Sequence, residues 1–308
     1  MSGAHPTATA GSRVEPWTKR AQAWITALRP RQWPKNGLVF VGLVFSLNLT
    51  QPEAVARVLV AFIVLCALAS SAYLVNDAVD APRDRQHPVK ARRPIAAGLI
   101  APQTAVRVAC VVTVAALAVA WWLGWGFLLV GAGYLALTAA YTLWLKRYPF
   151  IDVLTVAGGF VLRAAAGAVV LEVLISPWLL LCTLFGALFI VLAKRRQELA
   201  TLEAHAAAHR TSLSTLTLQL LDEATLIMAA CSIMAYSLYT FSERPGRPPF
   251  LMLTIPLVMY GIFRYLYLVR VDGAGGSPEE VLLTDRPLLG TVVLWAVLSV
   301  LILYLAPH

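Results

Sequence analysis

Charged residues are scarce in this 308-residue chain. Asp, Glu, Lys and Arg make up 13% of it, whereas a soluble domain carries about 25%. Hydrophobic residues account for 59%, and the mean hydropathy is +0.72. This composition is unlike that of a water-soluble domain and predicts a polytopic helical membrane protein.

Cysteines are also few, and they are dispersed. Cys66, Cys110, Cys182 and Cys231 all lie inside apolar runs, far apart in the sequence, which favours small core residues over a disulfide framework or a metal site. Residues 1–20 contain no apolar segment of the kind that a signal peptide requires. We expect residues 1–27 to form a polar, disordered tail and residues 28–308 to form a single transmembrane domain.

Long apolar runs are abundant. Nine of them have a length that suits a membrane-spanning helix, and the first and the sixth are the shortest. We therefore expect an all-α bundle of nine transmembrane helices. Their approximate ranges are 36–51, 54–75, 103–123, 126–145, 150–172, 177–193, 222–241, 249–269 and 287–306.

The Lys and Arg residues are distributed unevenly between the two sides of these predicted spans. With the N-terminus inside, twenty fall on inner segments and three on outer ones, a strong positive-inside bias. This bias accounts for the net charge of +9 without a nucleic-acid partner. It predicts a multi-pass protein of the inner (plasma) membrane with a cytoplasmic N-terminus. Two arginines fall inside spans: Arg163 is expected to face a polar cavity, and Arg264 to snorkel to the inner surface.

A group of three carboxylates follows the second apolar run. Asp77, Asp80 and Asp84 are spaced i, i+3 and i+7, which places them on one helix face. Pro82 predicts that the helix kinks or ends there, with Asp84 at the loop edge. Hard carboxylate oxygens suit Mg²⁺, which commonly bridges them to substrate phosphates. The alternative is a helix that simply ends in solvated acids.

Basic side chains follow these acids directly, including Lys90, Arg92 and Arg93. Acids for a metal beside bases for phosphate form a diphosphate site in outline. Further bases end later predicted helices, where the helix dipole and the positive-inside rule are alternative explanations. The last inner loop, residues 272–286, is rich in glycine and is expected to be a linker or a lid.

The motif Asn76-Asp77-x-x-Asp80-x-x-x-Asp84, together with nine spans, resembles the UbiA-type intramembrane transferase superfamily. The likeness covers nearly the whole chain from about Leu28. Residues 28–36, 84–98, 141–146 and 193–199 are similar to one branch of it, which transfers phosphoribose to decaprenyl phosphate. That resemblance implies a UbiA-like helical bundle with its active-site mouth at the cytoplasmic surface, and a product that feeds cell-wall arabinan synthesis.

Other members of the superfamily move a prenyl group from a prenyl diphosphate to an acceptor such as an aromatic ring, and they usually carry a second paired-acid motif. Here Asp152 stands alone after the fourth span, and Glu198 is the one acid among residues 194–200. The phosphoribosyl interpretation is therefore favoured, with prenyl transfer as the alternative. A transporter is a second alternative, although no internal symmetry is evident. The oligomeric state is left open.

The resemblance implies a role for each candidate residue. Asp77, Asp80 and Asp84 would hold Mg²⁺ on the diphosphate of phosphoribosyl diphosphate, and the polyprenyl phosphate would attack carbon 1 of the ribose. The candidate phosphate-binding bases are Lys35, Lys90, Arg92, Arg93, Lys146, Arg163, Lys194 and Arg195. Candidate hydrogen-bonding partners are Asn36, Asn76, Tyr141 and Glu198.

Overall fold

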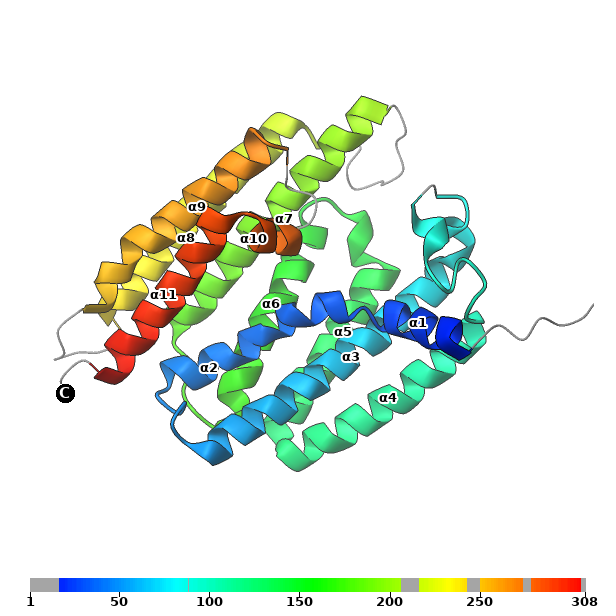
Figure 1. Cartoon of the computed structure of the whole chain (residues 1–308), viewed down its shortest axis with the longest axis horizontal. Helices are drawn as coiled ribbons and strands as arrows, with labels where there is room; N and C mark the ends of the chain where they lie inside the picture. The colour runs from blue at the N-terminus through cyan, green and yellow to red at the C-terminus, as the bar shows by residue number, and fades with distance from the viewer. Residues whose placement is uncertain (1–16, 88, 206–215, 243–249, 274–277, 306–308) are drawn as a thin grey trace, which may run out of the picture.

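The structure, a computed structural model, describes residues 17–87, 89–205, 216–242, 250–273 and 278–305, and all secondary structure in these ranges is helical. Figure 1 shows the helices gathered into one bundle. In chain order they are α1 (Trp17–Leu28), η1 (Pro30–Leu38), α2 (Val39–Phe45), α3 (Pro52–Asp84), η2 (Lys90–Arg92), α4 (Pro102–Leu123), α5 (Trp125–Leu143), η3 (Leu145–Arg147), α6 (Ile151–Val170), α7 (Pro177–His205), α8 (Leu218–Ser242), η4 (Phe250–Thr254), α9 (Ile255–Arg270), α10 (Pro278–Thr284) and α11 (Arg286–Leu305).

Eight helical segments within the described residues are long and apolar enough to cross a membrane. The protein is therefore an integral, multi-pass membrane protein, and the all-helical prediction is confirmed. The predicted first span, 36–51, is the one that this count leaves out, because α2 contains only seven residues. The 3₁₀ helix η1 precedes α2 directly and rises more steeply per residue. Placed end to end, η1 and α2 would extend about 28 Å, close to the thickness of a bilayer core.

Helix α1 lies where a disordered tail was expected. Residues 17–27, assigned to that tail from the sequence, are helical, and Ala23 and Ala27 are buried against Leu74 and Ala81 of α3. The sequence argument failed here because it weighed polarity and overlooked the small residues spaced i, i+4 that give α1 one buried face. Residues 1–16 lie outside the described residues.

Helices α2 and α6 cross with their backbones in close contact. A Cβ atom built on Gly167 would lie 1.9 Å from the carbonyl oxygen of Val39, and one built on Gly42 would lie 2.8 Å from the backbone of Gly167 and Ala168. Paired glycines let two helices approach until their backbones touch. This crossing fixes the segment around Asn36 against α6, and both segments contribute to the polar clusters described below.

The two ends of the bundle differ in character. The motif end is the one where α3, α5, α7 and α9 finish and α4, α6, α8 and α11 begin. At the opposite end, Arg57 of α3 donates to the carbonyl oxygens of Leu123 (3.1 Å) and Val170 (3.1 Å). The guanidinium thus caps the last turns of α4 and α6 together, as a cation at a helix C-terminus does.

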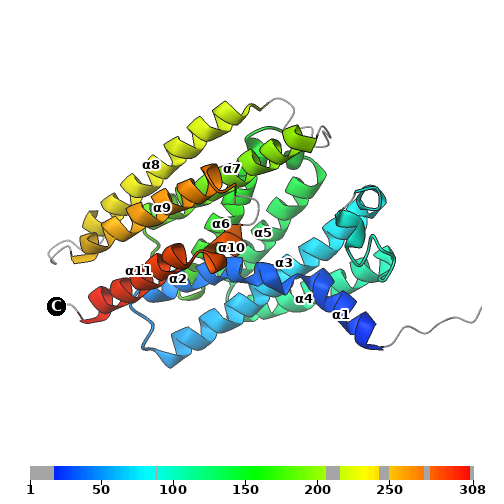
Figure 2. The same ribbon diagram turned by 45° about the horizontal axis from the view of Figure 1, so that its top comes forward.

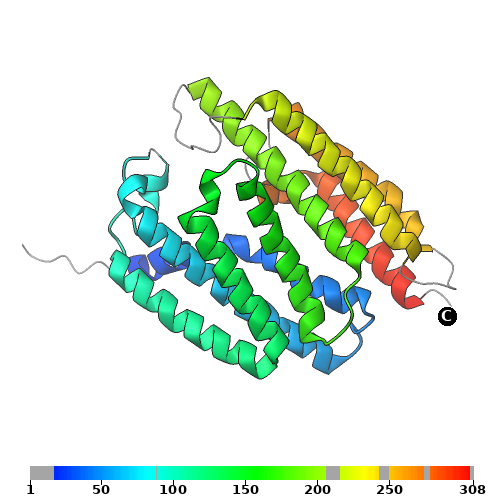
Figure 3. The ribbon, with the colours of Figure 1, turned by 180° about the vertical axis from the view of Figure 1, so that it is seen from behind.

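The helices fall into two groups that meet along α6. Figures 2 and 3 show α7, α8 and α9 along one side of the molecule, and α3 and α4 along the other. The α11 helix packs against α9 on the first side. Its Tyr304 hydroxyl donates to the carbonyl oxygen of Val44 (3.2 Å) and accepts from the Leu49 N–H (3.0 Å). The last helix is thereby tied to the region just after α2.

Arg264, which was expected to snorkel to the inner surface, forms an ion pair with Asp285 at the motif end. Its Nη2 and Nε atoms donate to the two oxygens of Asp285 at 2.7 and 3.2 Å, which joins α9 to the start of α11. The hydrogen bond from Arg264 lowers the pKa of the Asp285 carboxyl. Nearby, the predicted linker or lid contains α10, whose Val281 is buried against α7 and α9. Residues 274–277 of that loop lie outside the described residues.

Candidate active site

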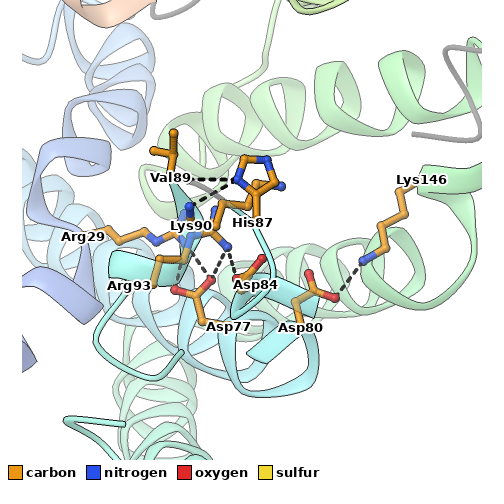
Figure 4. A network of polar contacts seen from close by, with 9 residues as sticks. All are labelled: Arg29, Asp77, Asp80, Asp84, His87, Val89, Lys90, Arg93 and Lys146. Carbon is orange, nitrogen blue, oxygen red and sulfur yellow. Dashed lines mark hydrogen bonds and ion pairs between the residues drawn. The ribbon is translucent and has the colours of Figure 1, made fainter. Parts of the chain in front are cut away.

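The three motif acids occupy the last turns of α3. Pro82 lies in the final turn, and the helix ends at Asp84, as the proline predicted. The Asp77 and Asp84 side chains are buried, with exposed fractions of 4% and 7%, and the Asp80 side chain is 21% exposed. Figure 4 shows Asp77 and Asp84 together beside two arginines, with Asp80 turned toward Lys146.

Asp77 is held by two arginines from different parts of the chain. Arg29, in the turn between α1 and η1, donates with Nη2 to both carboxylate oxygens at 2.6 and 2.8 Å. Arg93, which follows η2, donates with Nη1 to Asp77 at 3.1 Å and to Asp84 at 2.7 Å. A buried carboxylate is costly unless it is paired in this way. These four side chains therefore form a neutral cluster, which we call the Asp77 cluster.

Asp80 faces a third basic residue. Lys146, in the short helix η3 between α5 and α6, lies 3.4 Å from the Asp80 carboxylate. The contact brings the turn after α5 over the end of α3. A lysine predicted to bind phosphate therefore lies beside an aspartate predicted to bind the metal.

The donor atoms present at this end fit a hard divalent cation. Among the described residues, no three His, Cys, Asp or Glu side chains converge closely enough to hold a metal ion together. Two do converge, because Asp77 and Asp84 both bond to the same Arg93 nitrogen. That nitrogen marks a point where positive charge is stabilised by two carboxylates. Mg²⁺ commonly takes only one or two carboxylates and completes its octahedron with water and substrate phosphate.

A second polar cluster joins α5, α6 and α7 at the motif end. The buried Arg195 of α7 donates to Asp152 (3.0 Å), Glu198 (2.6 Å) and the Tyr141 hydroxyl (3.3 Å). The sequence left Asp152 alone after its span, but the structure brings it to the same guanidinium as Glu198. Arg195 thus pairs with two acids at once, and we call this group the Arg195 cluster.

A third cluster surrounds Arg163, which was expected to face a polar cavity and is buried among hydrogen-bonding groups of the protein. Its Nε, Nη1 and Nη2 atoms donate to the side-chain oxygen of Asn36 (2.7 Å), the Gly159 carbonyl (2.7 Å) and the Tyr134 hydroxyl (2.8 Å). The guanidinium also lies 4.7 Å from the centre of the Tyr134 ring. Because all three nitrogens already donate within the protein, this geometry favours a role in positioning η1, α5 and α6.

The remaining candidates lie outside these three clusters. Lys35 bonds to Gln32 within η1. Lys90 and Arg92 are exposed on the loop that carries Arg93, and Asn76 and Lys194 are half-buried. This loop is ordered by Arg85, whose Nε donates to the Ala96 carbonyl oxygen (3.2 Å). It is also ordered by the His87 side chain, which accepts the Lys90 backbone N–H (3.3 Å; Figure 4).

Sequence reasoning missed Arg29 and Tyr134 as site residues and left Asp152 without a partner. Arg29 lies within residues 28–36, a segment that the family resemblance had already singled out, so a signal was available. The loop position of Arg29 gave no sign that its guanidinium reaches a carboxylate 48 residues away. Tyr134 lies in an apolar helix and carried no signal in the sequence.

Comparison with known proteins identifies the family. The model of the UbiA prenyltransferase family matches residues 37–276. A decaprenyl-phosphate phosphoribosyltransferase of Mycolicibacterium smegmatis is 34% identical, over 96% of this chain and 96% of its own. Proteins of the same name from Mycobacterium tuberculosis and Corynebacterium glutamicum are 37% and 34% identical, over 88% and 95% of this chain and 91% and 90% of theirs.

Solved structures confirm the fold. A UbiA homolog from Archaeoglobus fulgidus bound to GPP and Mg²⁺ superimposes with a TM-score of 0.68 at 18% identity, covering 90% of this chain and 96% of that one. The apo structure of a UbiA homolog from Aeropyrum pernix gives a TM-score of 0.62 at 16% identity, over 89% and 98% of the two chains. The Archaeoglobus protein has also been solved with Cd²⁺.

Proposed function

This chain belongs to the UbiA prenyltransferase family, and from that premise we propose that it transfers 5-phosphoribose from phosphoribosyl diphosphate to a polyprenyl phosphate, releasing diphosphate. This reaction is a step toward the lipid-linked arabinose from which cell-wall arabinan is made. The observation that carries the proposal is the near full-length similarity to three decaprenyl-phosphate phosphoribosyltransferases. The identity of 34–37% extends over 88–96% of the chain.

The arrangement of charge supports a donor with two charged ends. Phosphoribosyl diphosphate carries a diphosphate at one end of the ribose and a phosphate at the other, whereas a prenyl diphosphate is charged at one end only. The chain places bases on two separate sets of elements. Arg29, Arg93 and Lys146 lie around the end of α3, while Lys194 and Arg195 lie on α7.

In the proposed reaction the chain's own residues hold and orient charge. Asp77 and Asp84 provide the carboxylates for Mg²⁺, with Asp80 beside them, and a bound Mg²⁺ would neutralise charge that develops on the leaving diphosphate. The basic side chains align the two ends of the donor. The lipid phosphate is already anionic and needs no strong general base, so positioning supplies most of the rate. Attack from the face opposite the leaving group predicts inversion at carbon 1.

The direct test uses the purified protein in detergent with Mg²⁺, phosphoribosyl diphosphate labelled in the ribose, and a polyprenyl phosphate. We expect label in the lipid extract, and we expect Asp77→Asn to remove it. Asp272→Asn makes the same chemical change at an exposed position of the motif end and should leave transfer unchanged. Label that stays in the aqueous phase, while geranyl diphosphate and 4-hydroxybenzoate yield product, would establish prenyl transfer instead.

We further propose that the motif end faces the cytoplasm across the inner (plasma) membrane. The support is the excess of twenty bases on that side over three on the other. Phosphoribosyl diphosphate and Mg²⁺ are both cytoplasmic, so the proposed substrate requires the same orientation. A single cysteine at position 85, in a cysteine-free background, should resist a membrane-impermeant thiol reagent in sealed cells. Labelling of that cysteine from outside contradicts the orientation.

A further inference from the structure

Arg29 combines an unfavourable backbone conformation with a precise contact. Its φ and ψ are 54° and 56°, in the left-handed region, which is unfavourable for a residue with a side chain. Such conformations persist where the surrounding structure imposes them, and they occur often at functional sites. At this position the chain turns from α1 into η1 and directs the guanidinium at Asp77.

The surrounding turn is fixed to one face of α3. The Ser70 hydroxyl donates to the Leu28 carbonyl oxygen (2.8 Å) and accepts from the Trp33 indole N–H (3.1 Å). The Arg29 guanidinium lies 4.8 Å from the centre of the Tyr73 ring. Ser70, Tyr73 and Asp77 are spaced i, i+3 and i+7, so α3 presents a continuous track to this turn. The backbone of Arg29 is therefore held in place, while its side chain is 26% exposed.

Charge balance in the Asp77 cluster determines what can bind there. Two arginines offset two carboxylates, so a divalent cation arriving alone finds a neutral cluster. It must also displace a guanidinium from Asp77. A cation that arrives with diphosphate meets a different balance, because the displaced guanidinium gains anionic oxygens to bind. Charge-assisted hydrogen bonds of this kind are about twice as strong as neutral ones.

We propose that Arg29 is an exchangeable counter-ion that makes the site accept metal and diphosphate together rather than the metal first. Without donor, Arg29 neutralises Asp77. With donor, Asp77 turns to the metal and Arg29 to a diphosphate oxygen, about the same fixed turn. This inference rests on the proposed diphosphate donor, but it is independent of whether the transferred group is phosphoribose or prenyl.

Isothermal titration calorimetry of the full-length protein in detergent tests the exchange, with Mn²⁺ alone and with preformed Mn²⁺–diphosphate as the two titrants. We expect the wild type to bind the complex at least about tenfold more tightly than Mn²⁺ alone. Arg29→Gln should change the two affinities in opposite directions. Mn²⁺ alone should bind more tightly, because Asp77 is released, and the complex should bind on the order of tenfold more weakly, because a charge-assisted hydrogen bond is lost.

Two further variants separate this role from a structural one. Arg31→Gln removes the same charge two residues away at an exposed position and should leave the ratio of the two affinities near the wild-type value. Arg29→Lys keeps the charge and should bind Mn²⁺ alone as the wild type does. An Arg29→Gln protein that binds both titrants more weakly, or both unchanged, overturns the proposal.

If Arg29→Gln does not fold, the two affinities of the wild-type protein test the proposal. In that case, wild-type protein that binds Mn²⁺ alone as tightly as the complex overturns the proposal, and the expected tenfold preference supports it. A failure to transfer phosphoribose affects none of these measurements, so the two proposals fail separately.

Discussion

Replacing Arg163 by methionine tests whether this arginine positions helices or binds the donor. Methionine fills much of the same volume but donates no hydrogen bond. It leaves the Asn36 side-chain oxygen and the Tyr134 hydroxyl without the donor that each now has. The Gly159 carbonyl also loses the side-chain bond, but as a helical carbonyl it keeps its place in the backbone ladder.

The expected magnitude follows from two opposing effects. Each buried acceptor left without a donor costs about 1–3 kcal/mol, and two are orphaned. Removing an intramembrane arginine returns about 2.5 kcal/mol of insertion cost. The net expectation is a loss of up to about 3.5 kcal/mol in the free energy of unfolding, which a thermal or denaturant titration in detergent detects.

A double-mutant cycle combines Arg163→Met with Tyr134→Phe, which removes the hydroxyl that Arg163→Met leaves without a donor. Alone it should destabilise the protein, whereas in the Arg163→Met background it should restore about 1–3 kcal/mol. Affinity for phosphoribosyl diphosphate, measured on the same four proteins, should follow stability. No coupling between the two positions refutes the positioning argument. An affinity that stays low after stability recovers means that Arg163 binds donor phosphate directly.

Three other predictions concern the scaffold and the acid motif. Gly167→Ala should destabilise the protein strongly in a thermal unfolding assay, since its Cβ would meet the Val39 carbonyl oxygen at 1.9 Å, whereas Gly186→Ala, with open space around it, should not. Asp285→Asn should lower thermal stability at pH 7. Because the folded-state pKa of Asp285 is lowered, the stability that the wild type gains from this ion pair should be lost as pH falls below about 4. A stability difference between the two proteins that persists in acid contradicts the ion-pair explanation. Asp80→Asn should lower transfer less than Asp77→Asn, since Asp80 lies outside the Asp77 cluster, and equal losses in the two rates argue that all three acids act together.

The sequence was sufficient for features set by local pattern. Apolar run length located the membrane helices, since twenty apolar residues have few alternatives to spanning. The spacing of Asp77, Asp80 and Asp84 placed them on the end of a helix, and Pro82 predicted that end. The polar surroundings of Arg163 also followed from the cost of leaving a charge in lipid.

Pairing between distant elements was beyond the sequence. Arg29 reaches Asp77, and Asp152 reaches Arg195, only because α1 and α7 pack where they do. Polarity also misled in two places. It suggested a disordered tail where α1 packs on α3, and it ended the sixth span at residue 193 although α7 continues to His205. In both places the polar residues belong to helices with one buried side, which composition does not reveal.

The Tyr304 hydroxyl sets a constraint on how the chain is built. It completes hydrogen bonds for Val44 and Leu49, residues that leave the ribosome some 250 positions earlier. During synthesis the Leu49 N–H gains this partner only when the final turn of α11 has been made, whereas the Val44 carbonyl oxygen also accepts from the Leu47 N–H nearby in the chain. Deletion of that turn therefore removes a contact of the N-terminal region, although the missing residues are C-terminal.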